Sequence, residues 1–294
     1  MPKNPEEVMV IRDVVPGITT FSVPFLRFGR IKIGGRGTVG MPLTLSPNSF
    51  EALVCSFLRI CQNTNRHAVK LTSGSLAVFS PVALTPTVQS KLQSIGGPVS
   101  YLVAPDIEHH IFLSPWSEAF PKAQIIGPEG LAEKREKDPS VTNVPFTTIF
   151  TKANKESIRV SQEFDADFEY EFVDSHPNKE LVFFHKPSKT LIEADLMFNL
   201  PATEQYSKTG INPTTGIATR LFGALQHTKD TAIAQKRVLW YGVSKSDREG
   251  FNKSMQKINS WGFENLIPCH GESIVGDGKG IFEKVFEWHL HGKK

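Results

Sequence analysis

Cysteine is scarce in this chain, and long apolar runs are missing from it. The three cysteines, Cys55, Cys61 and Cys269, are too few and too scattered for a disulfide framework or a cysteine-rich zinc site. The chain has no run of about 20 apolar residues, as a membrane-spanning helix would need. Its first residues hold no apolar core of signal-peptide length. We therefore expect a cytoplasmic protein in a reducing compartment.

An excess of charge of one sign is missing as well. The formal net charge is only +3 at pH 7, which is too small to indicate nucleic acid or a membrane as a partner. We expect a small-molecule substrate instead, and self-association into a homo-oligomer stays open. The 294 residues contain no internal repeat and no low-complexity linker. They predict a single domain over residues 1–294 with a sizeable core.

The segment Phe168–Asp195 organises the rest of the chain. Aromatic and charged residues alternate from 168 to 172, which is the period of a half-buried strand. Two apolar runs flank a Lys-Pro-Ser-Lys turn and predict an antiparallel hairpin, Leu181–Phe184 and Thr190–Ala194. Because the outer ends of a hairpin meet at one sheet edge, we expect His176 before it and Asp195 after it to lie together.

Strand and helix patterns alternate on both sides of this segment. Short apolar runs predict strands over residues 8–33, and apolar residues at helical spacing predict an amphipathic helix over residues 47–61. A strand–helix–strand unit follows over residues 67–103, and the last short strand is expected at Asn265–Ile267. We interpret the basic residues between 26 and 36 as solvated strand faces. The alternative is that they hold an anionic substrate.

Three loops that follow predicted strands carry residue types that bind metals. The first loop has the sequence Ala-Pro-Asp-Ile-Glu-His-His over residues 104–110. The hairpin contributes His176 and Asp195, and the third loop holds His270 in Pro-Cys-His-Gly. A single histidine after a strand more often caps it or faces solvent. Imidazoles and carboxylates gathered at one sheet edge form a donor set that suits zinc, iron or manganese alike.

This order of loops resembles the metallo-β-lactamase superfamily, in a divergent and poorly characterised branch. The superfamily's first motif is His-x-His-x-Asp-His in a loop after a strand. Its four ligand positions fall here on Ala104, Asp106, Glu108 and His109. The three later ligands fall on His176, Asp195 and His270. The resemblance runs from about Val14 to Ser273 and implies an αββα sandwich, in which two mixed β-sheets are flanked by helices.

The resemblance also implies which residues hold a metal. One metal position keeps all its ligands, which are Glu108, His109, Asp195 and His270. The other position has lost a ligand at Ala104 and keeps only Asp106 and His176 besides the shared aspartate. We therefore expect one tightly held ion, with zinc preferred and iron or manganese as alternatives, and a weaker second site.

Catalytic roles are expected for three residues of the same loops. Asp195 or Asp106 would orient a metal-bound water. His110 has two interpretations, because it could replace His109 as a ligand, or it could support the site from behind as a proton shuttle. Two neighbouring residues are expected to take no part: His185 should face solvent in the hairpin turn, and Cys269 should be buried rather than reactive.

Together these features predict a metal-dependent hydrolase. A metal-activated water would attack a small organic substrate of the ester, thioester or lactone type. The aromatic residues after the hairpin, Phe198, Phe222, Trp240 and Tyr241, favour an apolar or aromatic substrate. Two alternatives stay open, namely metal-assisted lyase, isomerase or oxygen chemistry on the same fold, and a non-catalytic pseudo-enzyme.

Overall fold

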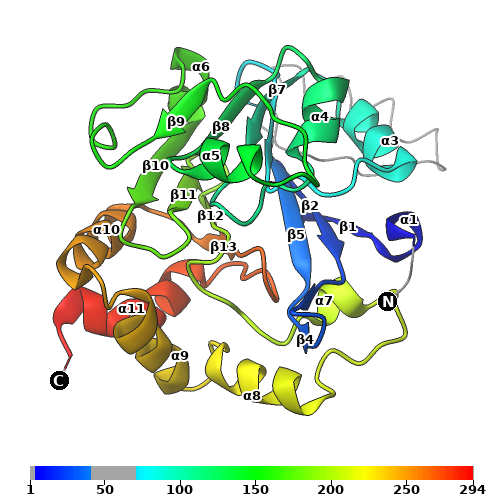
Figure 1. The fold of residues 1–294 in the computed structure, drawn as a ribbon. Coiled ribbons are helices and arrows are strands. Elements are labelled where there is room, and N and C mark those ends of the chain that lie inside the picture. Colours follow the sequence, from blue (N-terminus) through cyan, green and yellow to red (C-terminus); the bar gives the residue numbers. More distant parts are fainter. Residues whose placement is uncertain (1–3, 41–70, 294) are drawn as a thin grey trace, which may run out of the picture.

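The computed structural model describes residues 4–40 and 71–293, and within these ranges two β-sheets pack face to face (Figure 1). Neighbouring strands of the larger sheet are antiparallel from β1 to β6 and parallel from β6 to β9. Their order is β1 (Val10–Val15), β2 (Ile18–Val23), β5 (Gly35–Gly40), β6 (Leu76–Phe79), β7 (Val99–Val103), β8 (Gln124–Pro128) and β9 (Thr148–Phe150). The helix predicted over residues 47–61 lies outside the described residues.

The smaller sheet contains the predicted hairpin. Its strands are β10 (Phe168–Val173), β11 (Glu180–His185), β12 (Thr190–Ile192) and β13 (Asn265–Ile267). The pairings β10–β11 and β11–β12 are antiparallel, which confirms the hairpin, and β12 pairs with β13 in parallel. A separate two-stranded hairpin is formed by β3 (Leu26–Arg27) and β4 (Ile31–Lys32).

Helices cover the outer face of each sheet. The larger sheet is covered by α3 (Pro86–Ile95), α4 (Leu113–Ala119) and α5 (Leu131–Glu136). The smaller sheet is covered by α10 (Arg248–Ser260) and α11 (Gly278–His291), and α9 (Ile233–Val238) packs against α11. The remaining helical segments are α1 (Pro5–Val8), α6 (Gln162–Asp167), α7 (Thr203–Tyr206), α8 (Ile217–Leu225) and a π-helical turn at Leu239–Val243. This arrangement confirms the αββα sandwich and its mixed sheets.

Phenylalanine fills the space between the two sheets. Phe79 of the larger sheet lies 5.0 Å from Phe183 and 5.3 Å from Phe168 of the smaller sheet, measured between ring centroids. Phe164 of α6 stacks on Phe168 at 4.5 Å. Aromatic pairs at these distances stabilise beyond the burial of their area. Six phenylalanines belong to this inner core, namely Phe79, Phe150, Phe164, Phe168, Phe172 and Phe183.

Local signals in the sequence set the helix ends. Thr85 caps α3 by accepting a hydrogen bond from the Val88 amide, and Pro86 occupies the first helical position. Asp247 caps α10 in the same way by accepting from the Gly250 amide. Among the described residues no helix combines the length and the apolar character needed to cross a membrane.

His185 is placed differently from the prediction. It is the last residue of β11 and is fully buried, because the strand extends one residue beyond the apolar run. Its Nδ1 lies 2.7 Å from the Ser188 hydroxyl. Burial lowers the pKa of His185 to about 4, so the ring is neutral. The expectation that it faces solvent was wrong.

Candidate metal centre

His109 is held in a tight turn after β7 by the carboxylate of Asp106. Asp106 is fully buried, and its Oδ1 accepts hydrogen bonds from the backbone amides of Glu108 (2.8 Å) and His109 (2.7 Å). The same oxygen lies 2.9 Å from His109 Nδ1. A carboxylate at this distance holds the proton on Nδ1, so the Nε2 lone pair of His109 is left for a ligand.

His270 follows β13 and is fixed by a contact from the other end of the chain. Its Nδ1 lies 2.6 Å from the carbonyl oxygen of Gly34 and donates to it, which again leaves Nε2 with a lone pair. The next residue, Gly271, has φ +90°, and a Cβ there would lie 2.1 Å from the Asn199 carbonyl oxygen. Only glycine fits this close approach, which explains the His-Gly pair.

Asp195 follows β12 on a backbone held by a buried glutamate. The two carboxylate oxygens of Glu180 accept from the amides of Ala194 (2.6 Å) and Asp195 (3.2 Å). Asn178 donates from Nδ2 to Asp195 Oδ2 at 2.6 Å. The other oxygen, Oδ1, is buried and lies 3.1 Å from His270 Nε2. One oxygen of Asp195 is therefore anchored, and the other faces the histidines.

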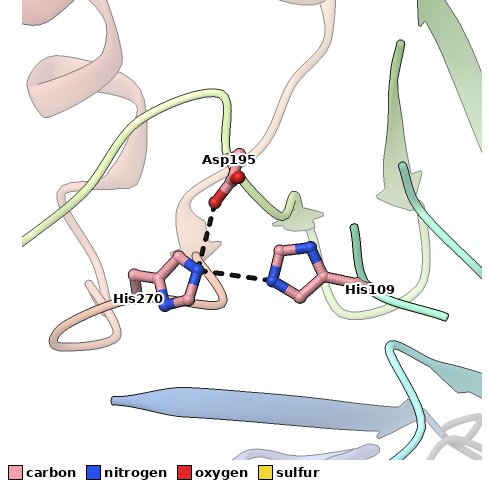
Figure 2. Close-up of side chains that lie close together, drawn as sticks. All are labelled: His109, Asp195 and His270. Atoms are coloured by element: carbon pink, nitrogen blue, oxygen red, sulfur yellow. Dashed lines mark hydrogen bonds and ion pairs between the residues drawn. The ribbon is translucent and has the colours of Figure 1, made fainter. Parts of the chain in front are cut away.

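The three side chains point their donor atoms at one another (Figure 2). His109 Nε2 lies 3.3 Å from His270 Nε2, and the donor atoms of His109, Asp195 and His270 all lie within 4.8 Å of one another. Two ligands at about 2.0–2.1 Å from a tetrahedral ion are about 3.3 Å apart. Two nitrogen lone pairs and a carboxylate oxygen at these separations fit a divalent ion with an open fourth position.

The charges of the site favour a cation. Burial alone would lower the pKa of His109, but the carboxylates of Asp106 and Asp195 outweigh it and raise that pKa to about 9. Burial would likewise raise the pKa of Asp195, but His270 and His109 hold it well below its ordinary value. The negative charge of these carboxylates is compensated by a positive charge beside them, which a proton on His109 or a bound metal ion can supply.

Three of the predicted ligands lie together, and the others do not join them. The carboxylate of Glu108 points to Lys134, at 2.8 Å, and is half exposed. His176 is buried, and its Nδ1 accepts a hydrogen bond from the Asn178 amide at 3.2 Å. Asp106 supports His109 from behind. Among the described residues, the group whose donor atoms converge contains neither Glu108 nor His176.

The second metal position predicted from the resemblance would lack a donor at Ala104. Ala104 is fully buried and packs in the cluster between the larger sheet and helices α3–α5. One oxygen of Asp106 is engaged by three groups of its own loop, whereas its other oxygen is buried and has no hydrogen-bond partner among the described residues. The weaker second site stays a prediction.

His110 is held by a buried arginine. Arg135 of α5 donates from one guanidinium nitrogen to His110 Nδ1 (3.1 Å) and to the His110 carbonyl oxygen (2.7 Å). Because arginine only donates, Nδ1 must be the acceptor, and the proton of the neutral ring is on Nε2. Burial and the charge of Arg135 lower the pKa of His110. In the neutral ring His110 therefore has an Nε2–H donor.

Several charged residues that shape the site were missed from the sequence. Besides Glu180, the buried Glu193 accepts from the amides of Leu196 (2.9 Å) and Met197 (3.3 Å). Burial and neighbouring carboxylates raise the pKa of both glutamates well above the ordinary value. The available signal was a glutamate within a run of apolar residues, at Leu191–Ala194, because such a residue must find buried partners.

Arg36 also departs from the prediction that the early basic residues are solvated. Its guanidinium is fully buried and donates to the Ser22 hydroxyl (3.0 Å) and the Pro268 carbonyl oxygen (2.7 Å). It also pairs with Glu204 at 3.2 Å. Arg36 thus fixes the backbone that leads into His270, and its charge is already paired.

A cavity of about 370 Å³ opens over the three donor atoms. Its walls are largely apolar, with Phe25, Phe28, Ile111 and Phe112 partly exposed at its rim. Arg27 lines the same cavity, and one of its guanidinium nitrogens lies 3.9 Å from Asp195 Oδ2. The cavity therefore offers an apolar wall, one cation and the His109 cluster to a small molecule.

This chain is similar to one sequence family and to several solved structures. A family model described as Domain of unknown function (DUF4336) matches residues 55–241. The metallo-β-lactamases VMB-1 and DIM-1 are 10% and 11% identical, with TM-scores of 0.55 and 0.50, each over 97% of this chain and 97% and 98% of their own. A metal-soaked Flv1 flavodiiron core from Synechocystis sp. PCC6803 is 12% identical, with a TM-score of 0.54, over 96% of this chain and 60% of its own. No curated protein sequence matches. The fold is that of the metallo-β-lactamase superfamily.

Proposed function

This chain belongs to the DUF4336 family, and we propose that it is a metal-dependent hydrolase acting on a small ester, thioester or lactone. The proposal is carried by one observation, which is the set of three donor atoms. His270 Nε2 lies 3.3 Å from His109 Nε2 and 3.1 Å from Asp195 Oδ1, and the donor atoms of the three residues all lie within 4.8 Å of one another. Both rings have their other nitrogen engaged by an acceptor, so their lone pairs are fixed toward a common point.

A divalent ion held by these atoms would lower the pKa of a bound water to about 7 and polarise a substrate carbonyl. Zinc suits three ligands of this kind, and iron or manganese would be accepted as well. Asp195 would give its Oδ1 to the ion, while Asn178 holds its Oδ2. Asp106 keeps the His109 ring oriented throughout.

The cavity favours a substrate with an apolar body and a polar or anionic end. Phe25 and Phe28 contact the apolar part, and Arg27 is placed to receive a carboxylate or carbonyl oxygen. His110 lines the same cavity, and its Nε2–H is available to donate to a substrate oxygen. The contact with Arg135 supports the role of a fixed donor for His110, among the interpretations that the sequence left open.

The direct test combines metal content with hydrolysis. Protein purified without chelators should contain about one divalent ion per chain by elemental analysis, and should hydrolyse members of an ester, thioester and lactone panel. His109→Ala and His270→Ala should lose both properties. His291→Ala, at an exposed position near the end of α11, is the control and should keep both. Equal metal content in the three variants would refute the site, and bound metal without any hydrolysis would refute the reaction.

A further inference from the structure

Helix α8 turns its apolar side chains outward. It lies on the outside of the molecule, at the opposite end from the layer of α3 and α4 (Figure 1). Ile217, Leu221 and Leu225 are 81%, 65% and 46% exposed, and their spacing of four residues places them on one stripe. The inward side holds the buried Thr219 and also Phe222, which packs on Phe198. A surface helix normally shows the reverse pattern, so this stripe marks an interaction surface.

The neighbouring stripe of α8 lines a basic cavity of about 580 Å³. Positions 216, 220 and 223 contribute to it, next to the apolar positions 217 and 221. The titratable residues of its lining are Lys32, Arg220, His227 and Lys229, without any aspartate or glutamate. Within the described ranges Arg220 and Lys229 have no carboxylate within ion-pair distance; the ion pairs nearest in sequence to them involve Glu204 and Lys236. The sequence contains no acidic residue from 205 to 229.

We propose that α8 docks this protein onto an anionic membrane surface. The stripe of Ile217, Leu221 and Leu225 would enter the headgroup region, and the adjoining basic cavity would receive a lipid phosphate. Apolar side chains beside the unpaired Arg220 on one helix, with Lys229 in the adjoining cavity, are the combination that favours binding in the plane of such a surface. The proposal does not depend on the proposed hydrolase reaction.

A second copy of the chain fits this face less well. A twofold interface centred on α8 would bring Arg220 and Lys229 toward the same residues of the other copy. Between Glu204 and Asp230 the chain has no acidic residue that could compensate Arg220. A stable dimer also needs about 20–30 residues on each side, whereas α8 exposes one short stripe. The small net charge of the whole chain led us to expect no membrane partner. A net charge does not reveal a local excess of cations such as the one beside α8.

The docking face is joined to the wall of the metal-site cavity. The Thr219 hydroxyl accepts from the Lys32 amide (3.2 Å) and donates to the Arg30 carbonyl oxygen (3.3 Å), which ties the β3–β4 hairpin to α8. Phe28 at the tip of this hairpin is 80% exposed and lines the metal-site cavity. A protein docked through α8 would therefore carry this hairpin close to the lipid.

The test is sedimentation of the full-length protein with lipid vesicles. Binding is expected to vesicles that contain phosphatidylglycerol and not to pure phosphatidylcholine, and it should weaken as salt rises. Arg220→Glu should weaken binding at least fivefold, since each cation near such a surface contributes about 1 kcal/mol. Leu221→Asp should weaken it by a similar or larger factor. Val275→Asp, which alters a 55% exposed apolar residue in the loop before α11, is the matched control and should bind like the natural protein.

Three results would overturn the proposal. One is the absence of binding to the anionic vesicles, and another is equal binding by Leu221→Asp and the natural protein. The third is a dimer, seen by sedimentation equilibrium, that Leu221→Asp dissociates, because the stripe would then be covered by a second copy. Both altered side chains are largely exposed, and circular dichroism should verify that each variant is folded. The salt dependence of the natural protein tests the proposal without any variant.

Discussion

The substitution Asp106→Asn separates two effects that the Asp106 carboxylate exerts on His109. An asparagine can still accept the two amide hydrogen bonds that wind the turn, at 2.8 and 2.7 Å, so the loop should keep its shape. It removes the negative charge 2.9 Å from His109 Nδ1. That charge makes the ring a stronger ligand, and losing such a partner lowers metal affinity by roughly 10–100-fold.

The same charge raises the pKa of His109 to about 9 in the metal-free protein. A proton then competes with the metal, and at pH 7 only about one molecule in a hundred has a neutral ring. The apparent metal affinity of the natural protein should therefore rise about tenfold per pH unit up to pH 9. In Asp106→Asn the proton is held less tightly, so the rise should level off at a lower pH.

The measurement is zinc affinity by chelator competition from pH 6 to pH 9. We expect Asp106→Asn to bind about 10–100-fold more weakly near pH 9, and the difference to shrink toward pH 6. Asp138→Asn, at an exposed turn residue bonded to Ser140, should follow the natural protein. Parallel curves for Asp106→Asn and the natural protein, or equal affinities near pH 9, would refute the role assigned to Asp106.

Three further outcomes follow from the same contacts. Gly271→Ala should lower the free energy of unfolding by at least about 2 kcal/mol, because it combines a positive φ with a clash on Asn199. Urea denaturation measures this loss. Gly262→Ala is the control and should change the stability little, because a Cβ there meets open space. The metal-free protein should lose about 3 kcal/mol of stability as the pH rises from 6.5 to 9, since the raised pKa of His109 stabilises the fold only while the ring is protonated; a flat profile by thermal denaturation would contradict this. His185 has the opposite effect, in acid. Because its pKa is lowered to about 4, its contribution to the free energy of unfolding is lost as the pH falls from 6.5 to 4. His185→Phe should make the stability less dependent on pH over this range.

The sequence predicted those parts of the fold that depend on periodicity. The alternation from 168 to 172 and the two apolar runs after it are sufficient for β10–β12, because side-chain direction in a strand has a period of two. Strand ends then place His176 and Asp195 at one edge. His109 and His270 could be identified because each follows a strand that joins the same edge of the sandwich.

The direction of side chains in the turns could not be predicted in this way. Glu108 is adjacent to His109, yet it points to Lys134 because the Asp106 hydrogen bonds set the rotation of that turn. The contact that fixes His270 comes from Gly34, which is 236 residues away in sequence. Neither contact leaves a local pattern, and the same holds for the arginine that engages His110.

The three donor atoms of the metal centre belong to both sheets of the sandwich. His109 extends from β7 of the larger sheet, whereas Asp195 and His270 extend from β12 and β13 of the smaller one. An ion held between them would act as a cross-link that closes a loop of 161 residues between the two histidines. Such a cross-link disfavours the unfolded chain by restricting its entropy. Metal loading should therefore slow hydrogen exchange in β7, β12 and β13 together. A bound ion would then link the two sheets as well as supply the chemistry of the cavity.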